Sequence, residues 1–536
     1  MLNQSPSPDS GGGVPARVGQ LRIFIVSWIL LSLLSVMWTL ATPISASPDE
    51  PAHIVKAAAV VRGELGGTPT PHGHIVRVPQ YIAFTQAQTC FAFKPDEPAS
   101  CAPAVPGDPG RLVDGSTTAG RYNPLYYAVV GWPSLLFDDV RGIYAMRMVS
   151  GVFTALFLAF AILLALGWRE SRIVMLSIGV AIPPMLLFLS GSINPNGVES
   201  AATLAAFLAV LAIVLRPDDR LLTLRCAILI ASGIVAANAR AISPLWLAIA
   251  VLLPLVLCTG ARLRSLISRP QIRWSIAIVG LGCVAAIGWI LVSNSLAAGL
   301  NDPTAAQVFP GQGGSAIGGF THVLRETFGY AQGMVGIFGW LDTPAPLVTY
   351  FTWAALTGAI LFAGVGVLRG RAAAFACSLV AALVFLPAIV QGVYITGGGL
   401  IWQGRYALAL FAMAVVGIAA VLAERATDAT ASIVGRITFA GWLLWAVSQF
   451  ASFATALHRY AVGSNGTWGA VIRSPEWTAP GGNVALLIGM GLLTVASAWL
   501  AWRVGSGNRP IRASSPADRT PGARAAQRAT VDDGHA

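Results

Sequence analysis

The chain has 536 residues, of which 55% are hydrophobic and only 11% charged, and its mean hydropathy is +0.69. A soluble domain carries about 25% charged residues, so this composition excludes an ordinary soluble enzyme and indicates a chain that lies in a lipid bilayer. The net charge of +11 is carried largely by arginines in short loops, so it indicates membrane orientation and not a nucleic-acid-binding surface.

The N-terminal region combines a polar tail with a first apolar segment. Residues 1–20 are rich in Ser, Pro and Gly without periodicity, which predicts a disordered cytoplasmic tail. The segment at about 21–44 is predicted to be a retained transmembrane helix, because its run of about 20 apolar residues is longer than the 7–15 of a cleaved signal peptide. A large external loop is expected to follow, from 45 to 122.

Two local features are predicted inside this first loop. The helical spacing of apolar residues from Pro51 to Glu64 indicates a short helix lying on the membrane, although an ordinary loop helix has the same periodicity. Cys90 and Cys101 share the loop, and on the outer side of the membrane they could form a local disulfide.

The remainder of the chain is read as a series of apolar segments of membrane-spanning length, which makes the fold class all-α and polytopic with about 12 transmembrane helices. After the first, the predicted spans lie at about 143–167, 173–191, 197–215, 222–238, 242–259, 274–294, 347–368, 372–391, 402–423, 436–457 and 483–503. The transmembrane domain thus covers 21–503, a second large external loop covers 295–346, and 504–536 is expected to be a disordered cytoplasmic tail.

Arginines in the short loops predict the orientation. With twelve spans, most of them fall on the side of the N-terminus, at Arg169, Arg172, Arg216, Arg220, Arg225, Arg262, Arg264, Arg269, Arg273, Arg369, Arg371, Arg425 and Arg436. Because cytoplasmic loops carry the excess of Lys and Arg, both termini are predicted to be cytoplasmic. The polar side chains that could do chemistry then gather on the outer face.

The acidic pair Asp49-Glu50 directly follows the first span. These carboxylates could bind a divalent cation such as Mg or Mn, or activate an acceptor hydroxyl, and His53 lies four residues after Asp49 as a further candidate substrate or metal ligand. The alternative is that the acids are solvated or that Asp49 is the N-cap of the following helix, with His53 on its surface.

Further candidate substrate-binding residues lie in the other outward segments. Glu199 begins a span, where an ionisable group is costly unless it has a partner, and Asn194 precedes it in a turn. Arg240 and Arg405 are outward arginines that could clamp a phosphate or could snorkel to the interface. The remaining candidates are Gln403 and Tyr406 beside Arg405, and Asp342 in the second large loop.

Five motifs together resemble the bacterial membrane family catalogued as domain of unknown function 2142 (DUF2142), over roughly residues 20–460. They are Pro-Asp-Glu-Pro-Ala-His, Tyr-Asn-Pro-Leu-Tyr-Tyr, Ser-Ile-Asn-Pro-Asn-Gly-Val-Glu, Phe-Gly-Trp-Leu-Asp and Gln-Gly-Arg-Tyr. One departure is Asn196, where the resemblance implies Asp, and this weakens a metal or base role at that position.

The family in turn resembles the class C (GT-C) glycosyltransferases, multi-span enzymes that use polyprenyl-phosphate sugars. The resemblance implies that Asp49 is the acceptor base or a metal ligand, that Glu50 assists it, and that Arg405 and Arg240 hold the lipid phosphate. The expected function is transfer of a sugar from a polyprenyl-phosphate donor to an envelope acceptor at the outer face of the cytoplasmic membrane. The alternatives are a transporter or flippase of lipid-linked envelope precursors, or a non-catalytic envelope scaffold.

Overall fold

The computed structural model describes residues 13–296, 309–427 and 431–507. Helix α1 (Gly13–Ala41) begins eight residues before the predicted span, and α20 (Asn483–Gly507) extends past residue 503, so both helices continue into the predicted tails. The rest of those tails, 1–12 and 508–536, lies outside the described residues.

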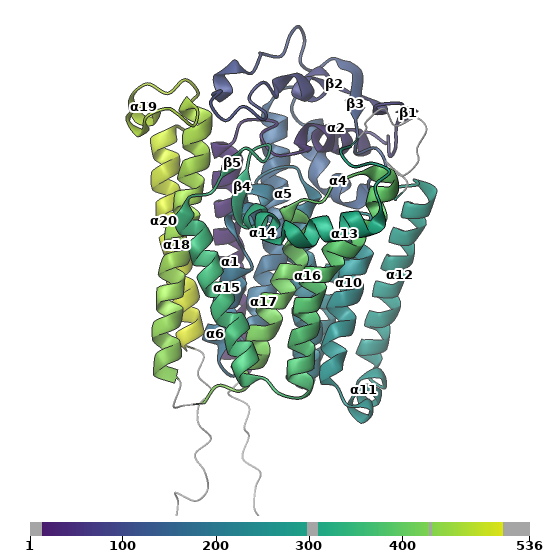
Figure 1. Ribbon diagram of the computed structural model, residues 1–536, viewed down its shortest axis with the longest axis vertical. Helices are drawn as coiled ribbons and strands as arrows, with labels where there is room; N and C mark the ends of the chain where they lie inside the picture. The colour runs from purple at the N-terminus through teal and green to yellow at the C-terminus, as the bar shows by residue number, and fades with distance from the viewer. Residues whose placement is uncertain (1–12, 297–308, 428–430, 508–536) are drawn as a thin grey trace, which may run out of the picture.

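A bundle of long helices makes up most of the molecule (Figure 1). Within the described residues, ten helices are long and apolar enough to cross a membrane. Besides α1 and α20 they are α5 (Arg141–Ala165), α8 (Pro195–Leu215), α9 (Asp219–Ala237), α12 (Pro270–Val292), α15 (Leu347–Val367), α16 (Arg371–Gly398), α17 (Leu408–Ala423) and α18 (Ala431–Val462). The prediction of an all-α, polytopic chain is confirmed.

The segment predicted to span at 173–191 is broken into two helices. α6 (Ser171–Val180) and α7 (Pro184–Ser190) meet at a bend of 65°. Pro183 and Pro184 cause the break, because proline donates no backbone hydrogen bond and disfavours helical geometry in the residue before it. Counted as one span, the pair raises the number of candidate spans to eleven.

The segment predicted to span at 242–259 is shorter than expected. It consists of α10 (Ser243–Leu252) and a 3₁₀ turn, η4 (Leu253–Leu257), that contains Pro254. At this length it is a short apolar helix and not a full span. The predicted twelve segments therefore correspond to ten full-length helices, one bent pair and one short helix.

Two helices fill the centre of the bundle. α8 and α17 pack against each other, and nearly every residue of both is buried. Helices that are apolar on all sides are stable only when other helices surround them. α12, α15 and α20 surround this centre and expose large apolar side chains such as Trp274, Phe362 and Leu492.

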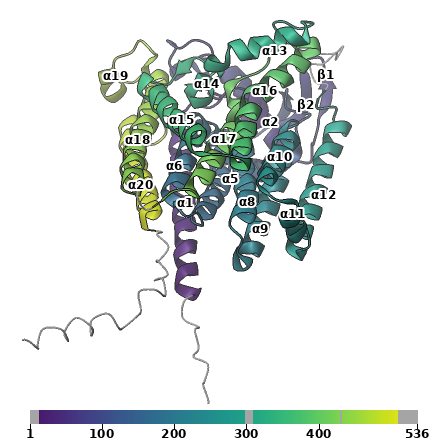
Figure 2. The same cartoon turned by 60° about the horizontal axis from the view of Figure 1, so that its bottom comes forward.

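The arginine-rich loops share one end of the bundle, where α11 (Gly260–Ile267) lies (Figure 1). Contacts tie these loops together: Arg216 pairs with Glu424 at 3.1 Å, and Arg371 donates to the Cys258 carbonyl at 2.6 Å. The loops thus lie on one side, as the sequence predicts, and α1 projects at this end in Figure 2. The assignment of this side to the cytoplasm stays a prediction from the charge rule.

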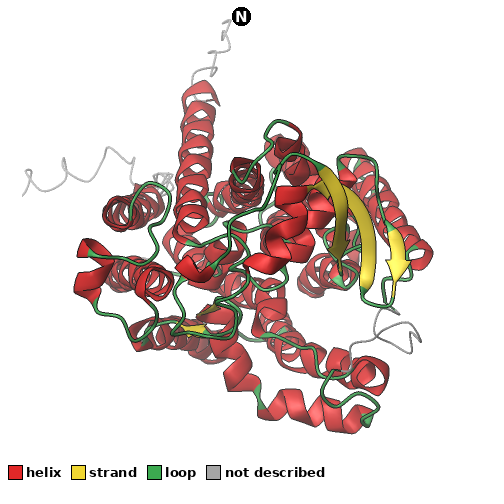
Figure 3. Cartoon of the chain, turned by 90° about the horizontal axis from the view of Figure 1, so that it is seen from above, coloured by secondary structure: helices red, strands yellow, loops and turns green. Residues whose placement is uncertain are grey.

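The first loop forms a cap over the opposite end. It contains α2 (Glu50–Val60), which packs on α4 (Pro124–Gly131) and on a three-stranded antiparallel sheet. The strands are β1 (Thr68–Thr70), β2 (Gly73–Pro79) and β3 (Leu112–Thr117), with the middle strand paired to both others so that Ile75 faces Thr68 and Ser116. Figure 3 shows the sheet lying over this end of the helices.

Smaller elements complete the cap. The structure joins Cys90 and Cys101 in a disulfide within the first loop. The second loop contributes two helices that lie across the bundle, α13 packing on α16 and α14 on the Gly404 turn (Figure 1). The remaining bounds are α3 (Gln80–Ala83), α13 (Ala316–Arg325), α14 (Thr327–Gly336), β4 (Ile337–Phe338), β5 (Thr343–Pro344) and α19 (Trp468–Arg473), with 3₁₀ turns η1 (Phe84–Gln88), η2 (Ala99–Cys101), η3 (Trp132–Leu135) and η5 (Gly404–Ala407).

Candidate functional site

A cavity of about 660 Å³ lies between the first-loop cap and the helices below it. Its polar lining includes Asp49, His53, Tyr122, Arg240, Gln403 and Tyr406. Another side is apolar and aromatic and comes from the spans α12 and α16, through Trp289, Ile290, Val390 and Tyr394. The cavity therefore joins a charged pocket at the end of the bundle to surfaces that belong to membrane-spanning helices.

Asp49 presents its carboxylate to this cavity from an unusual backbone conformation. It precedes α2 with φ of 63°, in the left-handed region that non-glycine residues rarely adopt and that costs about 1–2 kcal/mol. Asp49 is the N-cap residue of α2 by position, as the alternative expects, but its side chain makes no capping hydrogen bond. Instead Oδ2 accepts a hydrogen bond from Arg405 Nη2 at 2.6 Å, while the side chain remains 53% exposed.

Arg405 lies behind Asp49, on the turn η5 at the start of α17. Only 1% of its side chain is exposed. Gly404 allows this turn to press against α14: a Cβ there would lie 2.2 Å from the carbonyl oxygen of Tyr330. Within the described chain, Nε and Nη1 of Arg405 are buried without a hydrogen-bond partner. Asp49 is therefore the single acid paired with this guanidinium among the described residues.

The Tyr406 ring contacts the guanidinium groups of both Arg405 and Arg240. Its centroid lies 4.3 Å from the Arg240 guanidinium and 5.1 Å from that of Arg405. Arg240 also donates to Asn196 at 2.7 Å and pairs with Glu199 at 3.3 Å, and the Ser243 hydroxyl donates to Glu199 as well. Glu199 is thus buried with a partner and stabilises Arg240, whereas Arg240 itself lines the cavity.

His53 lines the cavity as a neutral side chain. Its Nδ1 lies 2.8 Å from the Tyr127 hydroxyl, and the Tyr122 ring stands edge-on to it. Burial lowers the pKa of His53 to about 4, an effect that the neighbouring Asp49 only partly offsets. At neutral pH the imidazole is therefore uncharged, which suits it to hydrogen bonding with a substrate and not to electrostatic capture of a phosphate.

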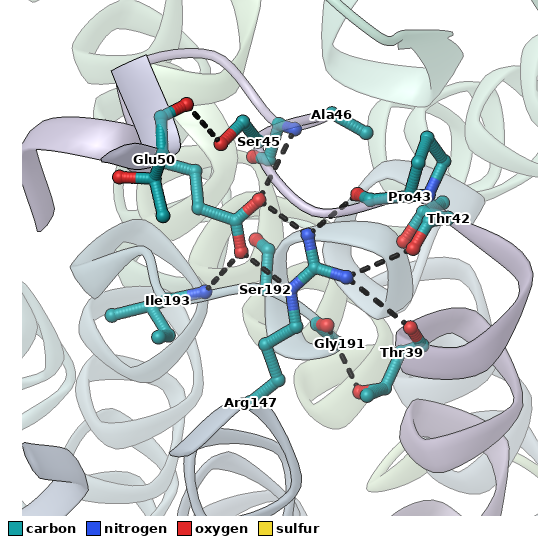
Figure 4. Close-up of polar contacts among 12 residues, drawn as sticks. Thr39, Thr42, Pro43, Ser45, Ala46, Glu50, Arg147, Gly191, Ser192 and Ile193 are labelled. Atoms are coloured by element: carbon teal, nitrogen blue, oxygen red, sulfur yellow. Dashed lines mark hydrogen bonds and ion pairs between the residues drawn. The ribbon is translucent and has the colours of Figure 1, made fainter. Parts of the chain in front are cut away.

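The structure corrects the expectation that Glu50 is a catalytic partner of Asp49. Glu50 is fully buried and pairs with Arg147, which donates from Nε at 2.7 Å and from Nη2 at 2.6 Å (Figure 4). The Ile193 amide donates to the same carboxylate at 3.1 Å. Arg147 in turn donates to the backbone carbonyls of Thr42 and Pro43, at the exit of α1. Glu50 therefore fixes the chain around Asp49 and leaves no oxygen for substrate.

This burial also argues against the predicted divalent-cation site on Asp49 and Glu50. Both oxygens of Glu50 accept hydrogen bonds from Arg147, so they cannot coordinate a cation without leaving a buried guanidinium unpaired. In the described parts of the chain, no group of three His, Cys, Asp or Glu side chains is placed to hold a metal ion. Glu50 therefore does not fit the predicted Mg or Mn site, and binding of a cation by Asp49 alone stays a prediction.

Two further candidates from the sequence lie outside the cavity. Asn194 caps α8 by accepting from the Asn196 amide and donates to the Pro48 carbonyl at 3.3 Å, so it supports the Asp49 turn from below. Asp342 pairs with buried Arg459 at 3.2 Å and accepts from the Phe93 amide at 3.0 Å. Both were predicted to bind substrate, and the structure corrects this, since neither lines the cavity.

Sequence reasoning missed several residues that shape the site. Arg147 stands inside a predicted span, and an ionisable residue there is a recognisable signal of function or of a buried partner. Tyr122 and Tyr127 belong to the Tyr-Asn-Pro-Leu-Tyr-Tyr motif, from which no site residue was predicted, yet one lines the cavity and the other contacts His53. Trp289 in α12 carried no signal, because a tryptophan near the end of a span is common at membrane interfaces.

Its composition and the ten apolar helices among its described residues make the chain a multi-pass membrane protein. Residues 31–414 match the family model described as "Predicted membrane protein (DUF2142)", and the chain belongs to this family. The resemblance seen in the motifs is confirmed, and the match stops inside α17, before α18 and α20.

Other comparisons add little. No curated protein matches the chain. Among solved structures, the crystal structure of ArnT from Cupriavidus metallidurans bound to undecaprenyl phosphate matches with 12% sequence identity and a TM-score of 0.40, covering 93% of this chain and 78% of ArnT. We rest no argument on so distant a likeness.

Proposed function

We propose that the chain is a glycosyltransferase that moves a sugar from a polyprenyl-phosphate donor to a cell-envelope acceptor at the outer face of the cytoplasmic membrane. One observation carries the proposal: the Asp49 carboxylate, held in a strained conformation and paired with Arg405, opens onto a cavity that is also lined by Arg240 and by membrane-spanning helices. Backbone strain that the surrounding structure maintains is common at functional sites.

The arrangement assigns roles to the two ends of the cavity. The apolar wall from α12 and α16 suits the isoprenoid chain of a donor that remains in the bilayer. Guanidinium groups bind phosphate oxygens in a bidentate manner. The phosphate group of the donor would therefore bind near Arg240 and the Asp49–Arg405 pair. The acceptor would enter from the first-loop side, past Asp49.

In the reaction, Asp49 accepts the proton of the acceptor hydroxyl, and the oxygen attacks the anomeric carbon of the donor sugar. The bond between that carbon and the phosphate oxygen breaks, and its electrons remain with the polyprenyl phosphate. The arginines stabilise the charge that develops on the departing phosphate. Hydrogen bonds engage only Oδ2 of Asp49 within the described chain, so Oδ1 is available as the base.

The alternative of a transporter has less support. α8 and α17 are buried along nearly their whole length and occupy the centre of the bundle. A pathway through the centre of the bundle would have to pass these two helices. The cavity lies under the first-loop cap, which is the placement expected for chemistry at one membrane face.

The test uses purified full-length protein and a polyprenyl-phosphate sugar with a radiolabelled sugar. Membrane extracts supply the acceptor, and the measurement is the appearance of label in the acceptor fraction. Asp49→Asn keeps the shape of the side chain and tolerates the left-handed conformation, but it removes the base. We expect it to reduce transfer by about 10²-fold or more, whereas Asp114→Asn, at an exposed acid of the same loop, leaves transfer unchanged. Full transfer by Asp49→Asn would refute the assigned role.

A further inference from the structure

The ion pair between Asp49 and Arg405 is asymmetric in its exposure. The Arg405 side chain is 1% exposed, whereas that of Asp49 is 53% exposed and lines the cavity. Arg405 itself does not line the cavity, whereas Asp49 and Tyr406, whose side chains both contact its guanidinium, do. An anion in the cavity therefore reaches Arg405 only if the Asp49 side chain moves away.

Arg405 is also short of acceptors. Its Nη2 donates to Asp49 at 2.6 Å and to the Tyr406 hydroxyl at 3.5 Å, while Nε and Nη1 are buried with no partner in the described chain. A buried charged donor without an acceptor costs more than about 1–3 kcal/mol. A guanidinium left in this state has donor capacity that a single Asp49 oxygen does not use.

We infer that the Asp49 carboxylate occupies the place of a ligand phosphate on Arg405, and that phosphate binding displaces it. This inference rests on the proposed function, because it takes the polyprenyl phosphate headgroup as the ligand. Arg405 exchanges one carboxylate oxygen for two phosphate oxygens, which match its planar donor pattern better. Asp49, released from the guanidinium, turns into the cavity as an unpaired carboxylate.

The exchange implies that the polyprenyl-phosphate donor binds before the acceptor hydroxyl is deprotonated. With no donor bound, Oδ2 of Asp49 stays paired with Arg405. With the donor phosphate on Arg405, the Asp49 carboxylate is free of the guanidinium and lies beside the anomeric carbon of the donor. The Tyr406 ring contacts Arg240 at 4.3 Å as well as Arg405 at 5.1 Å, so the displacement of Asp49 leaves two guanidiniums near one phosphate site.

The inference is tested by binding, without turnover. The probe is farnesyl phosphate, a short polyprenyl phosphate, titrated by calorimetry into the full chain in detergent. Removing the competing charge with Asp49→Asn is expected to tighten binding at least about fivefold, a typical coupling between linked sites. Arg405→Gln is expected to lose binding, in the wild-type background and in Asp49→Asn alike. Farnesol, which lacks the phosphate, is expected to bind wild type and Asp49→Asn equally.

A gain in affinity cannot result from misfolding, so the Asp49→Asn variant decides the question even if Arg405→Gln folds poorly. Unchanged or weaker binding of farnesyl phosphate by Asp49→Asn overturns the exchange and leaves Arg405 as a positioning residue for Asp49. The transfer assay separates this from the proposed function. If Asp49→Asn binds farnesyl phosphate more tightly and still transfers sugar fully, only the base role of Asp49 is refuted. If Asp49→Asn loses transfer without binding farnesyl phosphate more tightly, only the exchange is refuted.

Discussion

The buried pair of Glu50 and Arg147 yields the sharpest prediction of stability. In Glu50→Gln the side chain keeps its shape but loses its charge, so the Arg147 guanidinium stays buried without a counter-charge. Removing one partner of a buried ion pair costs about 3–5 kcal/mol. The structure places this pair near the upper end of the range, because both side chains are fully buried and two donors of Arg147 bind the carboxylate.

The assay is thermal unfolding in detergent, in which the fraction of protein that remains monodisperse is measured as the temperature rises. Glu50→Gln is expected to lower the unfolding midpoint by several degrees, whereas Asp114→Asn, in an exposed pair, is expected to leave it nearly unchanged. Replacing both partners, in Glu50→Leu/Arg147→Met, should recover part of the loss, since no charge is left unpaired. An unfolding midpoint of Glu50→Gln equal to wild type would refute the structural role and reopen a catalytic one.

Three further predictions concern single positions. His53 has a folded pKa of about 4, below the unfolded value of 6.5, so protonation favours the unfolded chain as the pH falls from 6.5 to 4. The stability advantage of wild type over His53→Gln should shrink by about 2–3 kcal/mol between pH 7 and pH 4.5, and a pH-independent difference in unfolding midpoint would contradict the shift. Gly404→Ala should destabilise by about 1–3 kcal/mol through its clash with α14, while Gly366→Ala, which meets no neighbour, should not; equal unfolding midpoints would count against the close approach. Asp342→Asn should destabilise by about 1–3 kcal/mol because buried Arg459 loses its counter-charge and keeps only backbone carbonyls as acceptors, yet leave the KM for donor and acceptor unchanged; a raised KM would restore the predicted substrate role.

The sequence was sufficient for the organisation of the molecule. Apolar segments of about 20 residues identify spans because only helices satisfy their backbone in lipid. The spacing of the arginine loops placed Asp49, Arg240 and Arg405 at the same end, and the structure brings Asp49 within 2.6 Å of Arg405. Loop charge and the positions of the apolar segments do not depend on packing, so they can be read without a structure, whereas the bend between α6 and α7 and the shortness of α10 changed the predicted number of full spans.

The sequence was insufficient where a role depends on a distant partner. Asp49 and Glu50 are adjacent and chemically alike, yet one opens onto a cavity and the other is buried against Arg147, 97 residues away. The difference arises because neighbouring side chains at the start of α2 point in different directions, and no composition or spacing rule specifies which. Asp342 was misassigned for the same reason, since its partner Arg459 lies 117 residues further along the chain.

The central claim is that Asp49 is the base of a sugar transfer to the cell envelope. The most direct measurement is envelope glycan analysis of cells that lack this protein and are complemented with wild type, Asp49→Asn or Asp114→Asn, at matched amounts of protein in the membrane. The account predicts that one glycosylated component disappears in the deletion, returns with wild type and Asp114→Asn, and stays absent with Asp49→Asn. Restoration of that component by Asp49→Asn, or an unchanged glycan profile in the deletion, would contradict it.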